Sequence, residues 1–122
     1  MKSRIATTFR NIISATTTAI AKKYIRKDRW YRYQDLRLKV YKDVFHPGLF
    51  RSTKVFAEWL SEQETGNKKI LEIGSGSGLI ALIAARKGAL VTAVDVNLKA
   101  VENTKFNAAL NHLEISVFHS DL

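Results

Sequence analysis

Residues 71–80, LEIGSGSGLI, place three glycines at alternate positions directly after an apolar run that contains one acid, Glu72. Glycine lets the backbone turn tightly and brings N–H groups close to a ligand, because no Cβ stands in the way. A short apolar run that ends at such a loop is typical of a buried strand. The stretch therefore predicts a strand, a ligand-binding loop and a following helix, with a carboxylate beside the loop.

Strand and helix patterns alternate from this loop to residue 122. Short apolar runs at residues 68–74, 90–97 and 114–122 are typical of strands, whereas residues 78–88 and 98–112 have helical patterns. Strands that alternate with helices through short connections are typical of a parallel sheet. We therefore predict an α/β fold, the N-terminal half of a Rossmann-like, doubly wound parallel sheet with about three strands. Right-handed crossovers are expected to place the second strand between the first and the third.

Residues 1–28 form a basic N-terminal segment in which no acid precedes Asp28. Apolar residues recur from Ile5 to Tyr24 close to the spacing of one helical face, which predicts an amphipathic helix. The β-branched residues of the stretch SATTTAI oppose a helix, because they lose side-chain freedom in it. We favour a helix packed on the domain over an arm that binds a surface, and both over a targeting segment.

Residues 29–66 are expected to form a short β-hairpin and a lead-in helix. The stretch RWYRYQDLRLKVY places aromatic and branched residues on both sides of a QDL turn, which predicts two short strands. Its interleaved Arg, Trp and Tyr residues could stack on bases, but cross-strand pairing is the commoner use of such residues. A cap at Ser52 or Thr53 and a helix from about Lys54 that stops at Gly66 are expected next.

The net charge of +9 belongs to one part of the chain. Residues 1–42 hold twelve Lys and Arg and two acids, a net charge of +10, whereas residues 43–122 carry −1. A basic segment on a nearly neutral body is expected to bind nucleic acid or another anionic surface, or to be only a solvated tail. The solvated tail is slightly favoured.

The sequence holds no cysteine, which excludes disulfides, thiol nucleophiles and cysteine-bound metals. This composition fits a reducing compartment, and we expect a cytoplasmic protein. No apolar run of the sequence approaches the roughly 18 to 20 residues of a membrane-spanning helix. His46, His112 and His119 lack metal-ligand spacing, so no metal site is predicted.

Each predicted strand delivers polar groups at its carboxyl end. They are Glu72 with the glycines, then Asp95 and Asn97, then Ser120 and Asp121. Ligands of doubly wound sheets bind at this edge of the sheet. Any one of these acids could cap a helix N-terminus instead. Three of them at one edge, beside a glycine loop, predict an adenosine-like ligand.

Two cofactors fit such a site, and Glu72 separates them. A dinucleotide lays a pyrophosphate over the glycine loop, where a nearby carboxylate would repel it. S-adenosyl-L-methionine has no phosphate and carries a sulfonium and an ammonium, which a carboxylate attracts. Asp95 fits either cofactor, because both contain a ribose whose hydroxyls a carboxylate can bind. Glu72 therefore favours S-adenosyl-L-methionine over a nicotinamide dinucleotide.

These motifs resemble those of a known family. LEIGSGSGLIAL resembles motif I of the class I S-adenosylmethionine-dependent methyltransferases, VTAVDVN their second motif, and VFHSDL the segment that ends their third strand. VFHPGLFRSTKVF is similar to the segment before motif I in small-domain methyltransferases related to the release-factor glutamine and ribosomal-RNA enzymes. The resemblance covers about residues 43–122. It implies a transferase that moves a methyl group from S-adenosyl-L-methionine to a nitrogen of protein or RNA.

The resemblance also implies roles for individual residues. Glu72 would orient the glycine loop and the cofactor's amino group, Asp95 would bind the ribose, and Val96 would pack on the adenine. Ser52 and Thr53 are weaker candidates, from a segment expected to close over the cofactor. Catalysis in this family is mostly positioning, and no catalytic residue is assigned. The implied cofactor-binding residues are Glu72, Gly74, Ser75, Gly76, Gly78, Asp95, Val96, Asn97, Asp121 and Leu122.

One family motif has no counterpart in this sequence. The relatives hold the acceptor nitrogen with an Asn/Asp-Pro-Pro-aromatic motif, whereas the only proline here is Pro47. The strand pattern also stops after three of the usual seven strands. We therefore expect residues 67–122 to be the truncated first half of a methyltransferase domain, able to bind cofactor but inactive alone. The alternatives are a nicotinamide-dependent oxidoreductase fragment and a non-catalytic basic module that binds RNA or an anionic surface.

Overall fold

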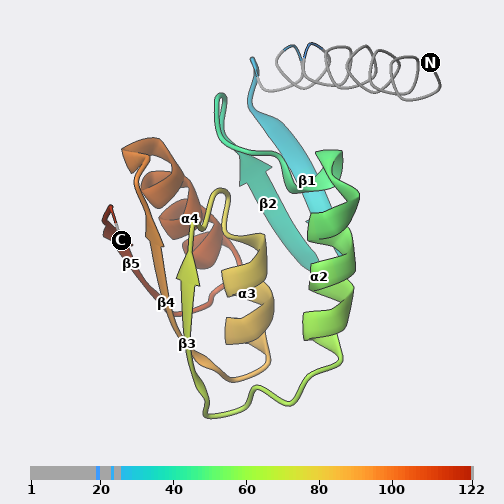
Figure 1. Ribbon diagram of the computed structural model, residues 1–122, viewed down its shortest axis with the longest axis vertical. Coiled ribbons are helices and arrows are strands. Elements are labelled where there is room, and N and C mark those ends of the chain that lie inside the picture. Colours follow the sequence, from blue (N-terminus) through green and yellow to red (C-terminus); the bar gives the residue numbers. More distant parts are fainter. Residues whose placement is uncertain (1–18, 20–22, 24–25, 122) are drawn as a thin grey trace, which may run out of the picture.

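The computed structural model describes residues 19, 23 and 26–121 of the chain (Figure 1). The predicted N-terminal helix or arm, residues 1–28, therefore lies almost entirely outside the described residues, and so does Leu122. In the described part, an antiparallel hairpin and one helix precede a parallel sheet with two further helices. None of the helices in this part has the length and apolar character needed to cross a bilayer.

The parallel sheet has three strands, β3 (Lys69–Ile73), β4 (Leu90–Asp95) and β5 (Ile115–His119). Helix α3 (Leu79–Arg86) connects β3 to β4, and α4 (Leu98–Leu110) connects β4 to β5. The strand order is β3-β4-β5, with β4 between its two neighbours and paired in parallel with both. The predicted α/β fold and its central second strand are therefore confirmed.

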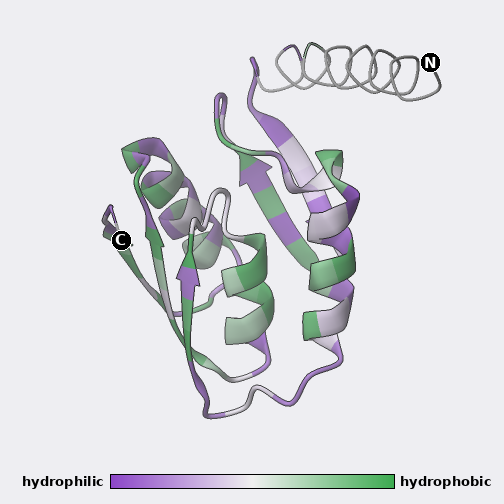
Figure 2. Cartoon of the chain, in the orientation of Figure 1, coloured by the Kyte–Doolittle hydropathy of each residue, from purple (hydrophilic) through white to green (hydrophobic). Residues whose placement is uncertain are grey.

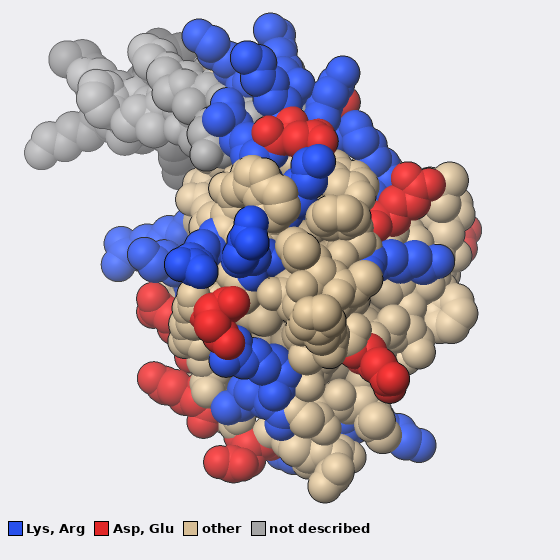
Figure 3. All heavy atoms as spheres, turned by 180° about the vertical axis from the view of Figure 1, so that it is seen from behind, with Lys and Arg blue, Asp and Glu red and all other residues tan. Residues whose placement is uncertain are grey.

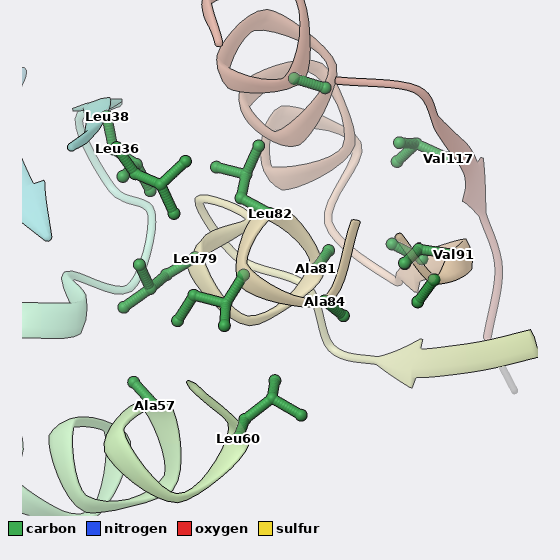
Figure 4. Packing of buried hydrophobic residues seen from close by; sticks show 14 of the residues in the cluster. Leu36, Leu38, Ala57, Leu60, Leu79, Ala81, Leu82, Ala84, Val91 and Val117 are labelled. Atoms are coloured by element: carbon green, nitrogen blue, oxygen red, sulfur yellow. The ribbon is translucent and has the colours of Figure 1, made fainter. Parts of the chain in front are cut away.

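The core lies between one face of this sheet, the helices and the hairpin. Figure 4 shows Leu79 and Leu82 of α3 between hairpin leucines on one side and Val91 and Val117 of the sheet on the other. Helix α3 is hydrophobic along nearly its whole length (Figure 2), because it is covered on several sides. The opposite face of the sheet exposes large apolar side chains, namely Leu71, Ile73, Leu90 and Phe118.

The hairpin consists of β1 (Arg29–Tyr33) and β2 (Leu36–Val40), paired antiparallel with Tyr33 opposite Leu36. The connection contains Gln34 in a left-handed conformation, with φ of 53°. Side chains alternate in β2 between buried apolar and exposed polar positions, which Figure 2 shows as alternating colours. The hairpin predicted from the aromatic and branched residues is therefore confirmed. A short 3₁₀ turn, η1 (Pro47–Leu49), follows it.

Helix α2 (Arg51–Ser61) begins earlier than the sequence pattern predicted. Its N-cap is Phe50, which makes no side-chain cap hydrogen bond, so the expected cap at Ser52 or Thr53 and start near Lys54 are wrong. The physical reason is the 3₁₀ turn η1, which leaves a single extended residue before the helix. The two hydroxyl residues consequently lie inside the first helical turn, where they cannot cap its free N–H groups.

The end of α2 also differs from the prediction, which placed its stop at Gly66. The helix ends at Ser61, and Glu62 is its C-cap. The backbone N–H of Glu62 donates to the carbonyl of Trp59, which tightens the last turn. The Lys87 ammonium, 2.8 Å from the Ser61 carbonyl oxygen, satisfies another free acceptor of this turn. These contacts end the helix before a glycine is needed.

Three asparagines, two on one face of α4 and one at its C-cap, bind the free edge of β2. Asn103, Asn107 and Asn111 follow one another at the four-residue spacing of a helix face. The Asn107 side-chain oxygen accepts from Lys39 N at 2.8 Å, and its amide nitrogen donates to Lys39 O at 2.9 Å. Asn111 makes the same pair of bonds with Arg37, at 3.0 and 2.7 Å. We call these three asparagine side chains the amide row. They bond the backbone of β2 as a neighbouring strand would.

The remaining member of the amide row extends the pairing to the end of the strand. The Asn103 side-chain oxygen accepts from Tyr41 N at 2.8 Å, and its nitrogen donates to Lys39 O at 2.6 Å. Asn103 and Asn107 are completely buried. Asparagine is a weak helix former, so these residues cost helix stability that the amide pairing offsets.

We expect Asn107→Ala to lower the free energy of unfolding by about 3 kcal/mol, because Lys39 N and the Ser77 carbonyl lose the Asn107 amide as a partner, while Lys39 O keeps its bond from Asn103. Asn111→Ala is the matched control, since its bonds are solvent-exposed and their loss is expected to cost about 1 kcal/mol. Urea unfolding of both variants measures the difference. Equal losses in the two variants would contradict a structural role for the buried amide.

Candidate functional site

The glycine loop connects the carboxyl end of β3 to the first turn of α3. Gly74 has φ of +82°, a conformation that other residues adopt only with strain, and a Cβ there would meet no atom within 4 Å. The backbone N–H groups of Gly74 and Ser75 both donate to the Val94 carbonyl, at 2.8 and 3.1 Å. The loop is thus held against β4 while the position of Gly74 stays open to a ligand.

Asp95, at the end of β4, binds this loop through its carboxylate. Oδ2 accepts from Gly76 N at 2.9 Å, and Oδ1 accepts from Asn97 N at 2.9 Å. One side chain therefore connects the glycine loop to the turn that precedes α4. The sequence placed Asp95 at this edge, but it did not reveal that the carboxylate organises the loop.

Gly78 has a packing role in the described structure. A Cβ at this position would lie 3.0 Å from the Thr104 methyl group, so only glycine allows α3 to begin this close to α4. Thr104 Oγ1 in turn lies 3.0 Å from Ser75 Oγ and 3.0 Å from the Gly76 carbonyl oxygen. Thr104, which sequence reasoning missed, holds the loop from the buried side through these two bonds. The sequence indicates this role only weakly, through one more polar residue on the buried face of α4.

A cavity of about 200 Å³ opens beside the glycine loop. Phe45, Pro47 and Thr53, from the chain before α2 and its first turn, contribute to the cavity wall. Closure of this segment over a cofactor stays a prediction. Phe45 also stacks on Phe50, with ring centroids 4.7 Å apart. The other lining residues are Glu72, Gly74, Ser75, Gly76, Ser77, Leu79, Ile80 and Asp95.

Five of the predicted cofactor-binding residues line this cavity, and the others lie elsewhere. Val96 is 65% exposed in the turn after β4, and Asn97 caps α4 by accepting from Lys99 N at 3.0 Å. Asp121 is exposed after β5. These three share the carboxyl edge of the sheet with the cavity, whereas Gly78 is buried against α4 and Leu122 lies outside the described residues.

Glu72 has the most strongly perturbed environment of the site. Its Oε2 is buried and has no hydrogen-bond partner among the described residues. Burial raises the pKa of this carboxyl to about 8, the Ala81 N–H in the first turn of α3 opposes that rise, and the charge of Asp95 adds to it. The side chain is therefore neutral at pH 7, and a cation in the cavity would favour its ionised form.

Two of the three histidines bond backbone groups through their rings. His46 is buried, and its Nδ1 accepts from Gly48 N at 3.0 Å to cap η1. The ring nitrogen Nε2 of His119 lies 2.8 Å from the Val96 carbonyl oxygen. Among the described residues, no three His, Cys, Asp or Glu side chains are grouped so that they could hold a metal ion.

Residues 36–122 match the family model described as the methyltransferase small domain. The chain belongs to this family. The match covers the hairpin strand β2, the lead-in helix, the glycine loop and the whole parallel sheet. It confirms the resemblance drawn from the glycine loop and the strand-end motifs.

Two curated relatives agree with this assignment. A protein of Methanocaldococcus jannaschii, which carries a provisional name as a protein N5-glutamine methyltransferase, is 39% identical over 90 residues, 73% of this chain and 44% of its own length. The ribosomal protein L11 methyltransferase of Cupriavidus taiwanensis is 36% identical over 74 residues, 60% of this chain and 25% of its own length. The chain thus spans less than half the length of these relatives.

A solved structure shows the same fold. The S-adenosylmethionine-dependent methyltransferase of Agrobacterium tumefaciens matches with a TM-score of 0.66 and 28% sequence identity. The match covers 78% of this chain and 33% of that protein. The Rossmann-like architecture is therefore shared with an enzyme of the predicted class.

We expect Glu72→Gln to raise the free energy of unfolding at pH 7 by about 2 to 3 kcal/mol. The unfolded glutamate loses its proton near pH 4.5, while the folded one keeps it until about pH 8. The stability of the native chain therefore falls as pH rises through this window, and the variant lacks that contribution. Urea unfolding at pH 5 and pH 8 measures the effect, with the exposed Glu102→Gln as control. An unchanged pH dependence in Glu72→Gln would refute the assignment.

Proposed function

We propose that this chain forms the cofactor-binding part of an S-adenosyl-L-methionine-dependent methyltransferase whose complete form methylates a nitrogen of protein or RNA. The buried, unpartnered Oε2 of Glu72 beside the glycine loop is the observation that carries the proposal. A folded protein rarely leaves a buried carboxyl oxygen without a partner unless a ligand supplies one. The ammonium of this cofactor is such a partner.

The shape of the cavity wall fits the same cofactor. Gly74 offers a backbone surface without a Cβ, and the cavity is flanked by the two carboxyl groups of Glu72 and Asp95. The charge of Asp95 opposes a pyrophosphate, and a cationic ligand would favour the ionised form of Glu72 beside it. These observations support S-adenosyl-L-methionine over a nicotinamide dinucleotide, and they make the oxidoreductase alternative the weaker one.

Different residues around the cavity would bind different parts of the cofactor. Asp95 uses one lone pair of each oxygen within the protein, so each oxygen retains capacity to accept a ribose hydroxyl. The exposed Val96 side chain at the same rim would pack on the adenine, and Asp121 would accept from its amino group. Asn97 keeps the turn in place through its cap on α4.

The proposed reaction is methyl transfer, and the role of this site is to position the methyl donor. S-adenosyl-L-methionine, when bound, supplies a methyl group on a sulfonium that a nitrogen nucleophile can attack. The glycine loop, held by Val94, Asp95 and Thr104, would orient that ligand. The gain in rate from such a site is largely one of proximity and orientation. No residue of this chain is assigned as an acid or a base.

We expect Asp95→Asn to weaken binding of S-adenosylhomocysteine by about tenfold or more, because the amide keeps one acceptor oxygen for the two N–H groups of Gly76 and Asn97 and loses the charge that favours two ribose hydroxyls. Calorimetric titration of the full chain measures this, with Asp35→Asn at the far hairpin turn as control. Binding of NAD in place of S-adenosylhomocysteine would overturn the proposal, and so would a folded chain that binds neither.

We also expect binding of S-adenosylhomocysteine at pH 7 to release a proton. Glu72 is neutral in the free chain because its pKa is about 8, and the ligand's ammonium would lower that pKa. Titrations in phosphate and in Tris, whose ionisation enthalpies differ, measure the number of protons released. Glu72→Gln should abolish the release, whereas Glu102→Gln should leave it unchanged. Equal heats in both buffers for the native chain would show that Glu72 does not meet the ligand's cation.

A further inference from the structure

The outward face of the hairpin combines basic and aromatic side chains. We call this surface the hairpin face and define it by Trp30 and Arg32 of β1 together with Arg37 and Lys39 of β2. The pairing register sets Trp30 opposite Lys39 and Arg32 opposite Arg37. Trp30 is 56% exposed, and both arginines are exposed as well. The core of the protein does not account for any of these four positions.

The two arginines lie directly opposite each other. Like charges at opposed positions of an antiparallel pair destabilise the sheet. In the part of the chain that the structure describes, no acid forms an ion pair with Arg32 or Arg37. The fold therefore carries an electrostatic cost at this pair, and a polyanion that lies across the hairpin would remove it.

Trp30 and Arg37 together form a flat platform. The Arg37 guanidinium lies over the Trp30 ring, 5.0 Å from the ring centroid. This cation–π contact orders both planar groups on the surface. Exposed aromatic rings and guanidinium planes are the groups on which unpaired bases stack.

The charge around this platform is strongly positive. Residues 26–42 hold seven Lys and Arg but only two acids. Asp28 pairs with Lys39 at 3.6 Å, and Asp35 pairs with Arg86 at the other end of the hairpin. In the view from behind, Figure 3 shows Lys and Arg gathered at one end of the molecule, with few acids among them. A phosphate backbone would find several cations there.

The hairpin leads from this surface to the candidate cofactor site. Strand β2 is followed by a segment that includes Asp43, which pairs with Lys99 at the start of α4 at 3.8 Å. Two residues further on, Phe45 lines the cavity beside the glycine loop. A chain of nucleotides that follows β2 toward its carboxyl end therefore approaches the rim of the cavity.

We propose that the hairpin face binds single-stranded RNA and directs it to the cofactor site, which makes RNA the class of molecule that carries the methyl acceptor. This inference rests on the proposed function for the acceptor role but not for RNA binding itself. An acidic protein or an anionic membrane would use the positive charges alone. The exposed Trp30–Arg37 platform favours RNA, because only a nucleic acid supplies both phosphates and stacking bases.

The test is fluorescence anisotropy of a labelled 15-nucleotide oligo(U) RNA titrated with the full chain. Arg32→Gln/Arg37→Gln should weaken binding about tenfold and lower the slope of log K against log salt by about 1.4. Trp30→Leu should weaken binding about tenfold and leave that slope unchanged. The matched control, Lys68→Gln/Lys69→Gln, removes two exposed charges before and at the start of β3, and should stay within about twofold of the native chain.

Several outcomes would overturn the inference. They are an unchanged affinity in both hairpin variants, an equal loss in the lysine control, and tighter binding to a polyglutamate peptide, to phosphatidylserine vesicles or to oligo(dU). Far-ultraviolet circular dichroism of each variant confirms that it is folded. Titration of S-adenosylhomocysteine into the same samples separates the two proposals. Cofactor binding without hairpin-dependent RNA binding refutes the RNA inference alone, and the reverse result refutes the proposed function alone.

Discussion

The amide row of α4 is the contact on which the rest of the structure depends. Its asparagines bind the edge of β2 through both donor and acceptor, so the helix serves as the neighbouring strand that β2 lacks on that side. Because Asn107 also donates to the Ser77 carbonyl at 2.7 Å, one side chain joins the hairpin, the helix and the glycine loop. Amide pairing fixes direction and register, which apolar packing alone does not.

The same helix determines how the glycine loop is presented. Thr104 holds the loop from within the protein, Gly78 allows the close approach that this requires, and Asp95 holds the loop from the end of β4. The loop therefore keeps its shape through contacts that a ligand need not supply. Glu72 is the exception, since its buried oxygen is unpartnered in the described structure. A preorganised loop beside one unsatisfied carboxyl is the arrangement expected of a site that recognises a cation.

Family membership bears on the cofactor, whereas the surface of the hairpin bears on the methyl acceptor. The family match and the shared fold concern the cofactor half of the molecule, in which the sheet edge, the glycine loop and the cavity lie together. The hairpin face concerns the proposed partner, and its opposed arginines form no ion pair among the described residues. Helix α4 contacts both regions. Its asparagines bind the hairpin, and Thr104 binds the glycine loop. The position of this helix thus relates the cofactor site to the proposed RNA-binding surface.

The order of strands and helices, the glycine loop and the acids at the strand ends were determined by the sequence itself, because hydrophobic period and turn chemistry are local properties. The bounds of α2 were not, since the 3₁₀ turn before it and the ammonium of Lys87 set them. The amide row joins residues that are 62 to 74 positions apart in the sequence. A local sequence pattern does not predict such contacts. The raised pKa of Glu72 was likewise decided by the tertiary structure. Burial and the neighbouring charge of Asp95 arise only when separate strands meet at one edge.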